Sequence, residues 1–120
     1  MREAWEVERP SVVIYRDPGA SRAVLHEVCA GAEEEGVPTR VEPVGEADGH
    51  GAAALAHLAA LDSKLEVGVG IDAGGVIAVH HAKLPPAAPA HVTSPSAGPP
   101  DWRRAGQVAA RIVTGLPIAP

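Results

Sequence analysis

Strand-like and helix-like segments alternate along the first part of the chain, and this alternation constrains the fold more than any other feature. The β-branched run 11–15 precedes apolar residues at helical spacing between Ser21 and Gly36. A second alternating run, 39–44, precedes the alanine-rich helical stretch 52–61. Strands that alternate with helices favour a parallel sheet covered by helices on both faces.

The middle of the chain predicts a hairpin followed by a long loop. The runs 65–71 and 76–81 are rich in Val and Ile, and the turn residues Asp72–Gly75 separate them. A short turn of this chemistry predicts two antiparallel strands. The proline-rich segment 84–100 is expected to be loop, apart from a short extended piece near 90–92.

A last helix and a single domain complete the expected fold. Residues 102–114 have helical spacing, with Asp101 as the expected cap and Gly115 and Pro117 as stop signals. We expect a flexible lead-in at 1–10 and one domain at 11–120. The predicted fold is α/β, a three-layer α/β/α sandwich with a mixed, mostly parallel sheet of four to five strands.

Composition limits the core and excludes several classes of function. Phenylalanine is absent and aromatic residues are 2% of the chain, so the core must be built from Val, Ile, Leu and Ala. In the alanine-rich helix, we expect Leu55, Leu58 and Leu61 to face inward. The net charge of −5, with no Lys/Arg-rich run, argues against nucleic-acid binding. No apolar run approaches the roughly 20 residues that span a bilayer, so no membrane association is predicted.

The N-terminal residues carry charges and lack the apolar region of a secretory signal. We therefore expect a cytoplasmic protein, with association with a bacterial microcompartment left open.

The glycine-rich string 68–75 allows two interpretations. It is similar to the phosphate loop of actin-like ATPases, which need two large lobes that 120 residues cannot supply, and to a dinucleotide-binding glycine loop, which should follow a strand and open a helix. Another β-branched run follows it here, so a plain hairpin turn is favoured. A stand-alone α/β domain that binds a small ligand at this turn remains an alternative.

Three adjacent acids, Glu33, Glu34 and Glu35, end the first predicted helix. Carboxylates are ligands for a hard cation such as Mg²⁺. Neighbouring residues on a helix point about 100° apart, so the three do not form one cage, and a solvated charge run is the other interpretation. Acids at a helix C-terminus are electrostatically unfavourable, which invites a functional reason.

Histidine and cysteine give no further site. His80 and His81 lie in a predicted strand and point to opposite faces, which argues against a shared zinc ion. Cys29 lies in a helical pattern and is expected to be a buried structural thiol. No nucleophile with a base partner can be assembled, so no catalytic residue is predicted.

Three segments resemble a known family. Residues 31–38, GAEEEGVP, resemble the signature G-[IA]-E-E-E-G-[IV]-P, and residues 67–85 resemble a hairpin that runs into histidine and then lysine, leucine and proline. Residues 109–117, AARIVTGLP, resemble the closing motif A-A-R-[LI]-V-x-G-[IL]-P. The family is the small subunit of the reactivating factor of cobalamin-dependent diol and glycerol dehydratases.

The resemblance implies a fold like the medium subunit of these dehydratases and a non-catalytic, chaperone-like role. It implies a large partner subunit that binds ADP or ATP and carries the ATPase activity, and a dehydratase whose damaged cobalamin leaves after subunit exchange. The chain has no cofactor of its own, and adenosylcobalamin is acted on only indirectly.

The resemblance also carries over a metal role to one residue. Glu34 occupies the place of the glutamate that shares Mg²⁺ with acids of the large subunit. Glu33, Glu35 and Arg111 are further candidates for the partner interface; Arg111 either pairs with an acid across that interface or decorates a helix. Two other expectations are that the isolated chain self-associates through this surface, and that a medium-type dehydratase subunit is the main rival assignment.

Overall fold

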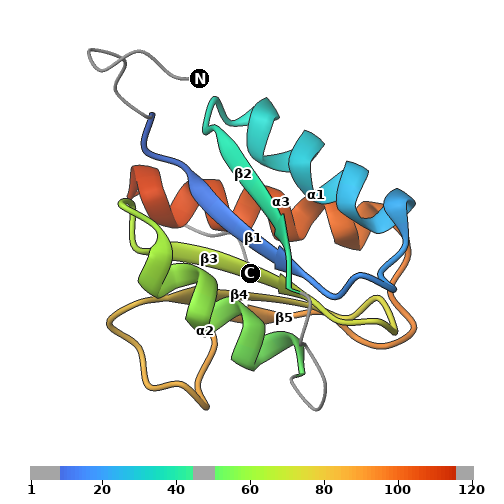
Figure 1. Ribbon diagram of the computed structural model, residues 1–120. Helices are drawn as coiled ribbons and strands as arrows, with labels where there is room; N and C mark the ends of the chain where they lie inside the picture. Colours follow the sequence, from blue (N-terminus) through green and yellow to red (C-terminus); the bar gives the residue numbers. More distant parts are fainter. Residues whose placement is uncertain (1–8, 45–50, 116–120) are drawn as a thin grey trace, which may run out of the picture.

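The computed structural model describes residues 9–44 and 51–115, which form one mixed sheet and three helices (Figure 1). The expected lead-in at 1–10 lies mostly outside the described residues, and the expected stop signal Pro117 lies outside them. The strands are β1 Val12–Arg16, β2 Thr39–Pro43, β3 Val67–Ile71, β4 Ile77–His81 and β5 His91–Val92. The helices are α1 Arg22–Glu34, α2 Ala52–Asp62 and α3 Pro99–Thr114.

The sheet has the strand order β2-β1-β3-β4-β5. β1 pairs in parallel with β2 and β3, while β4 pairs in antiparallel fashion with β3 and β5. The prediction of a mixed, mostly parallel sheet of four to five strands is confirmed, because β4 runs opposite to the four other described strands. The reversal comes from the β3–β4 hairpin, because a tight turn can join only antiparallel strands.

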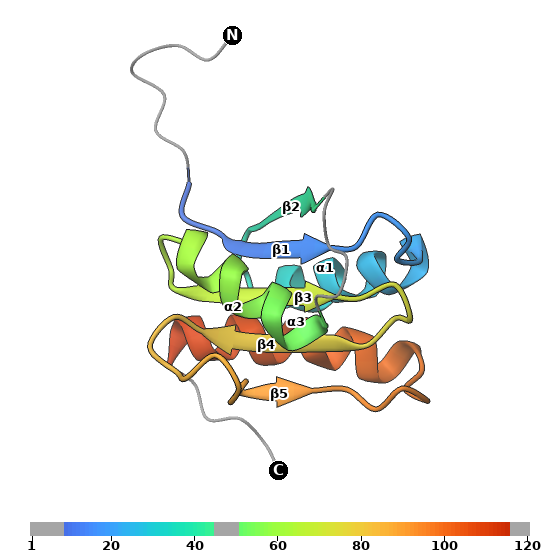
Figure 2. The ribbon, with the colours of Figure 1, turned by 60° about the horizontal axis from the view of Figure 1, so that its bottom comes forward.

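Helices lie on both faces of the sheet, with α2 in front of it and α1 and α3 behind it in Figure 2. The alternation of β3 shows which residues meet which layer. Val67, Val69 and Ile71 join the hydrophobic core with α1 and α3. Gly68 and Gly70 face the other way, against the backbone of α2.

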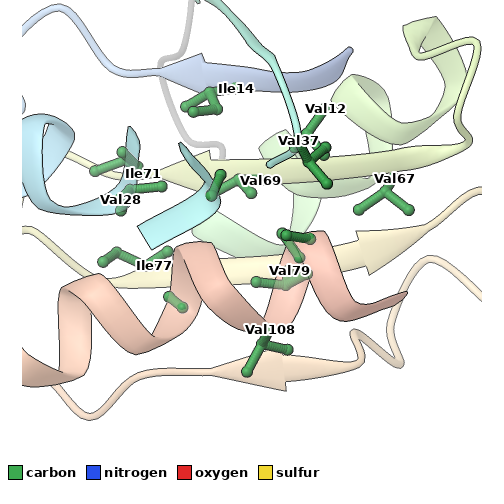
Figure 3. Packing of buried hydrophobic residues seen from close by; sticks show 14 of the residues in the cluster. Val12, Ile14, Val28, Val37, Val67, Val69, Ile71, Ile77, Val79 and Val108 are labelled. Carbon is green, nitrogen blue, oxygen red and sulfur yellow. The ribbon is translucent and has the colours of Figure 1, made fainter. Parts of the chain in front are cut away.

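The main core lies between the sheet and the pair α1 and α3, and it is aliphatic (Figure 3). Ile14, Val69 and Val79 contribute from three neighbouring strands and are all 0% exposed. Val28 of α1 and Val108 of α3 close the core from the helical side. The buried hydrophobic residues confirm the prediction of a core built from Val, Ile, Leu and Ala, and the partly buried Trp102 packs against it.

The inner face of α2 was predicted wrongly. Leu55 is fully buried, but Leu58 and Leu61 are 41% and 58% exposed. The buried positions are instead mostly alanines: Ala52, Ala56, Ala59 and Ala60. The reason is the close approach of α2 to β3, which leaves room on this face for small side chains.

The start of α3 also differs from the prediction. The helix begins at Pro99 after the N-cap residue Gly98, so Asp101 lies inside the first turn. From there its Oδ2 accepts a hydrogen bond from the backbone nitrogen of Gly98 at 3.1 Å. Pro99 and Pro100 fit the first helical positions because these need no backbone N–H donor.

Candidate partner interface and cation site

The three adjacent acids lie where α1 ends, as the sequence predicted. Gly36 follows them with φ of +77°, a conformation that glycine adopts without strain. The backbone nitrogens of Gly36 and Val37 donate to the carbonyl oxygens of Glu33 and Ala32, which closes the helix. The carboxylates thus lie at the negative end of the helix dipole, where a positive charge is favoured.

Two arginines of α3 supply positive charge to this region. Arg111 Nε donates to Glu35 Oε1 at 2.8 Å, so Arg111 pairs with an acid of its own chain. Neither sequence-based alternative for Arg111 included this pairing. The Glu35 side chain is only 23% exposed, which indicates that the pair stabilises the contact between α1 and α3.

Arg103 is the residue that the sequence analysis missed. Its Nε donates to Glu27 Oε1 at 3.0 Å and its Nη2 to Glu27 Oε2 at 3.4 Å. Its remaining nitrogen, Nη1, lies 3.4 Å from Glu34 Oε1. Arg103 is separated from Glu27 by 76 positions, as Arg111 is from Glu35, so α1 and α3 run in the same direction.

Two glycines allow α1 and α3 to approach closely enough for these ion pairs. A Cβ atom at Gly31 would lie 2.0 Å from the backbone oxygen of Arg103, and one at Gly106 would lie 2.0 Å from that of Val28. Separations under 3.0 Å are essentially never seen for real Cβ atoms. We call this contact the glycine seam, and it fixes which residues of α3 face the acids of α1.

The acids in and next to α1, near the glycine seam, differ in how far their side chains are exposed. Glu27 and Glu35 are 22% and 23% exposed and pair with the arginines within the chain. The Glu34 side chain is 48% exposed, and Glu33 is also exposed. Glu34 can therefore reach both the guanidinium of Arg103 and a group outside the chain.

Glu34 and its neighbours suit a cation shared with another molecule rather than a complete metal site within this chain. The guanidinium of Arg103 already acts as a cation beside Glu34, and carboxylate oxygens are what Mg²⁺ prefers. Within the described residues, no group of three or more His, Cys, Asp or Glu side chains could hold a metal ion. A cation bound through Glu34 would need its other ligands from water or from a partner.

The glycine-rich turn and His80, two further candidates from the sequence, have structural roles in the described part of the chain. The Asp72–Gly75 segment is a hairpin turn, closed by hydrogen bonds to the backbone and side-chain oxygens of Asp72. His80 is fully buried, and its ring nitrogens lie 3.0 and 3.1 Å from the carbonyl oxygens of His81 and Pro86. The plain hairpin predicted from the sequence is therefore what the chain forms.

Cys29 lies half-buried between α1 and β2, where Thr39 Oγ1 donates to its sulfur at 3.8 Å. Burial, and to a lesser extent the charge of Glu33, raise the pKa of the Cys29 thiol, while the hydrogen bond from Thr39 lowers it. The net effect is an increase, which disfavours the reactive thiolate. The geometry agrees with a structural thiol.

No helix in the described part of the chain has the length and apolarity needed to cross a bilayer.

Comparison with known proteins gives consistent results. Residues 9–119 match the model of a family described as the dehydratase medium subunit. Over 108 residues the chain is 38% identical to a probable glycerol dehydratase-reactivating factor small subunit of Citrobacter freundii, with 89% of this chain and 90% of the relative covered. It is 33% identical over 109 residues to a propanediol dehydratase-reactivating factor small subunit of the same organism, covering 91% and 90%.

Two solved structures have the same fold. A structure named glycerol dehydratase reactivase superposes with a TM-score of 0.86 at 36% identity, covering 93% of this chain and 98% of the other. A diol dehydratase-reactivating factor complexed with ADP and Mg²⁺ superposes with a TM-score of 0.82 at 30% identity, covering 94% and 100%.

Proposed function

The chain belongs to the dehydratase medium subunit family, as a small subunit of a diol or glycerol dehydratase-reactivating factor, and from this membership we propose that it is the exchangeable subunit of a chaperone-like complex. The complex releases damaged cobalamin from inactivated dehydratase. The ATPase activity resides in the large subunit, and this chain contributes binding surface rather than chemistry.

One observation carries this proposal: the same residues, 9–119, match the family of the enzyme's medium subunit, while the relatives are reactivating-factor small subunits. Two chains with one fold can compete for one position in an assembly. Exchange of this chain with the enzyme's medium subunit would loosen the enzyme and let the damaged cofactor leave. Intact adenosylcobalamin then rebinds.

The contact with the large subunit is proposed to include the end of α1. Glu34 is exposed, and its Oε1 lies 3.4 Å from Arg103 Nη1 within the chain. We assign Glu34 as a ligand of Mg²⁺ shared with acids of the large subunit, and we include Glu33, Glu35 and Arg111 in the same contact with that subunit. When bound, Mg²⁺ would join carboxylates of two subunits that otherwise repel each other.

An exchange assay tests the proposal. Purified reactivating factor, in which this chain carries a fluorescent label, is mixed with inactivated dehydratase that still holds its damaged cobalamin. The proposal predicts that label appears in the dehydratase fraction on size exclusion and that cobalamin is released in parallel. Release of cobalamin without any transfer of label, or with no displacement of the medium subunit, would refute subunit exchange.

A reconstitution assay addresses the rival assignment as a medium-type dehydratase subunit. A true medium subunit would restore diol or glycerol dehydration when added to the catalytic large subunit. This chain is predicted to give no activity in that reconstitution, with the enzyme's own medium subunit as the positive control.

A further inference from the structure

We infer that Arg103 is a positioning residue that holds the Glu34 carboxylate in the free subunit and must release it when the shared cation binds. This inference rests on the proposed metal role of Glu34 and adds a regulatory contact within the chain itself.

The geometry of the guanidinium carries the inference. Arg103 presents two nitrogens to the carboxylate of Glu27, at 3.0 and 3.4 Å. Because the guanidinium is planar and its donors form a rigid fork, this double contact fixes the direction of the third nitrogen, Nη1. That nitrogen lies 3.4 Å from Glu34 Oε1. Glu27 therefore orients Arg103, and Arg103 in turn orients Glu34.

The register of the two helices keeps this arrangement in place. Glu27, Gly31 and Glu34 follow each other at spacings of four and three residues, so they lie on one face of α1. The backbone oxygen of Arg103 lies over Gly31, between the two acids, at a distance that admits no side chain. The base of the Arg103 side chain is therefore fixed between both carboxylates.

The contact with Glu34 is the weaker of the two that Arg103 makes. The Arg103 and Glu34 side chains are 41% and 48% exposed, whereas Glu27 is 22% exposed. A cation that approaches Glu34 meets the positive charge of Arg103, so binding requires the exposed Glu34 carboxylate to turn away from Nη1 while the double contact with Glu27 keeps the guanidinium in place. The contact thus sets the Mg²⁺ concentration at which the subunit joins its partner.

The experiment measures the Mg²⁺ concentration at half-maximal binding of the full chain to the large subunit, by fluorescence anisotropy, with thermal melts to verify folding. Arg103→Gln frees Glu34 and is expected to lower this concentration about two- to five-fold, the range for an exposed ion pair. Glu27→Gln leaves the guanidinium only Glu34 to pair with and is expected to raise it. Arg22→Gln, at the opposite end of α1, is the charge-matched control and should leave it unchanged.

The Arg103→Lys variant distinguishes the effect of the guanidinium contact with Glu34 from the effect of the positive charge alone. Lysine keeps the positive charge but lacks the fork that spans two carboxylates, so the half-maximal concentration should fall toward that of Arg103→Gln. A lysine variant equal to the unsubstituted chain would overturn the inference, as would shifts of Arg103→Gln and Glu27→Gln in the same direction. If Glu34→Gln leaves the Mg²⁺ dependence intact, the proposed metal role itself fails, and this inference with it.

Discussion

The glycine seam between α1 and α3 makes a prediction that opposes helix propensity. Gly31 and Gly106 both lie inside helices, where alanine is favoured over glycine by about 1 kcal/mol. Propensity alone therefore predicts that Gly31→Ala and Gly106→Ala stabilise the fold. The structure predicts the opposite, because each new methyl group would meet the backbone of the facing helix.

The size of the effect follows from the distances. Each Cβ would lie 2.0 Å from a backbone oxygen, and real Cβ atoms keep at least 3.0 Å, so the helices must separate by about 1 Å. A backbone atom cannot move aside by changing rotamer, so the cost should lie near or above the upper end of the usual 1–3 kcal/mol for overpacking. After the gain in helix propensity, each substitution should reduce the free energy of unfolding by about 2 kcal/mol.

Urea denaturation followed by circular dichroism at 222 nm measures this change. Gly74→Ala is the matched control, because Gly74 is exposed and the new Cβ would meet only Asp72 Oδ1 at 3.4 Å; its effect should stay within about 0.5 kcal/mol. The double variant should lose less than the sum of the single losses, since one separation of the helices relieves both clashes. If either seam variant were as stable as the original chain or more stable, the packing argument would be wrong.

Three further predictions concern single side chains. Leu55→Ala should lower the free energy of unfolding by about 2–5 kcal/mol because Leu55 is fully buried. Leu61→Gln should change it by less than about 0.5 kcal/mol because Leu61 is 58% exposed. Equal losses in urea denaturation would contradict the orientation of α2. Burial, and to a smaller extent the charge of Arg104, lower the pKa of His91, while Asp101 opposes this. The stability that His91 contributes should therefore be present above the ordinary histidine pKa and be lost as the pH falls through its pKa in the folded chain. Melts of the His91→Gln variant should lack this part of the loss of stability in acid. The raised pKa of Cys29 predicts a contribution to stability that is present below the ordinary thiol pKa and lost as the pH rises through the pKa in the folded chain. The Cys29→Ala variant should therefore lose less stability at alkaline pH. Rapid modification of the folded chain by a thiol reagent at neutral pH would count against the burial of Cys29.

The order and type of the elements could be predicted because each is specified locally. The β-branched runs, the turn at Asp72–Gly75 and the stop at Gly36 all act within a few residues, and the structure places elements where these signals lie. The error at α2 arose from the assumption that leucine marks the buried face. The alternating glycines Gly68 and Gly70 were the available signal, because a strand with two missing side chains on one face lets a helix approach closely.

The candidate site could be predicted only in part. The acids at the end of α1 follow from the sequence, since they stand next to a helix stop. The pairing of Glu27 with Arg103 and of Glu35 with Arg111 joins residues 76 positions apart and depends on how two helices pack. No local pattern encodes such a register, although a glycine inside each of the two helices indicates a close approach.

The most direct test of the account is binding of the tagged chain to the large reactivating-factor subunit, co-expressed and purified with Mg²⁺ or with a chelator. We predict a stable complex in Mg²⁺ that is weakened by the chelator and by Glu34→Gln. Glu42→Gln, an exposed acid on the edge strand β2, should leave binding unchanged. Failure of the unsubstituted chain to bind the large subunit under either condition would contradict the central claim that this chain works as its partner.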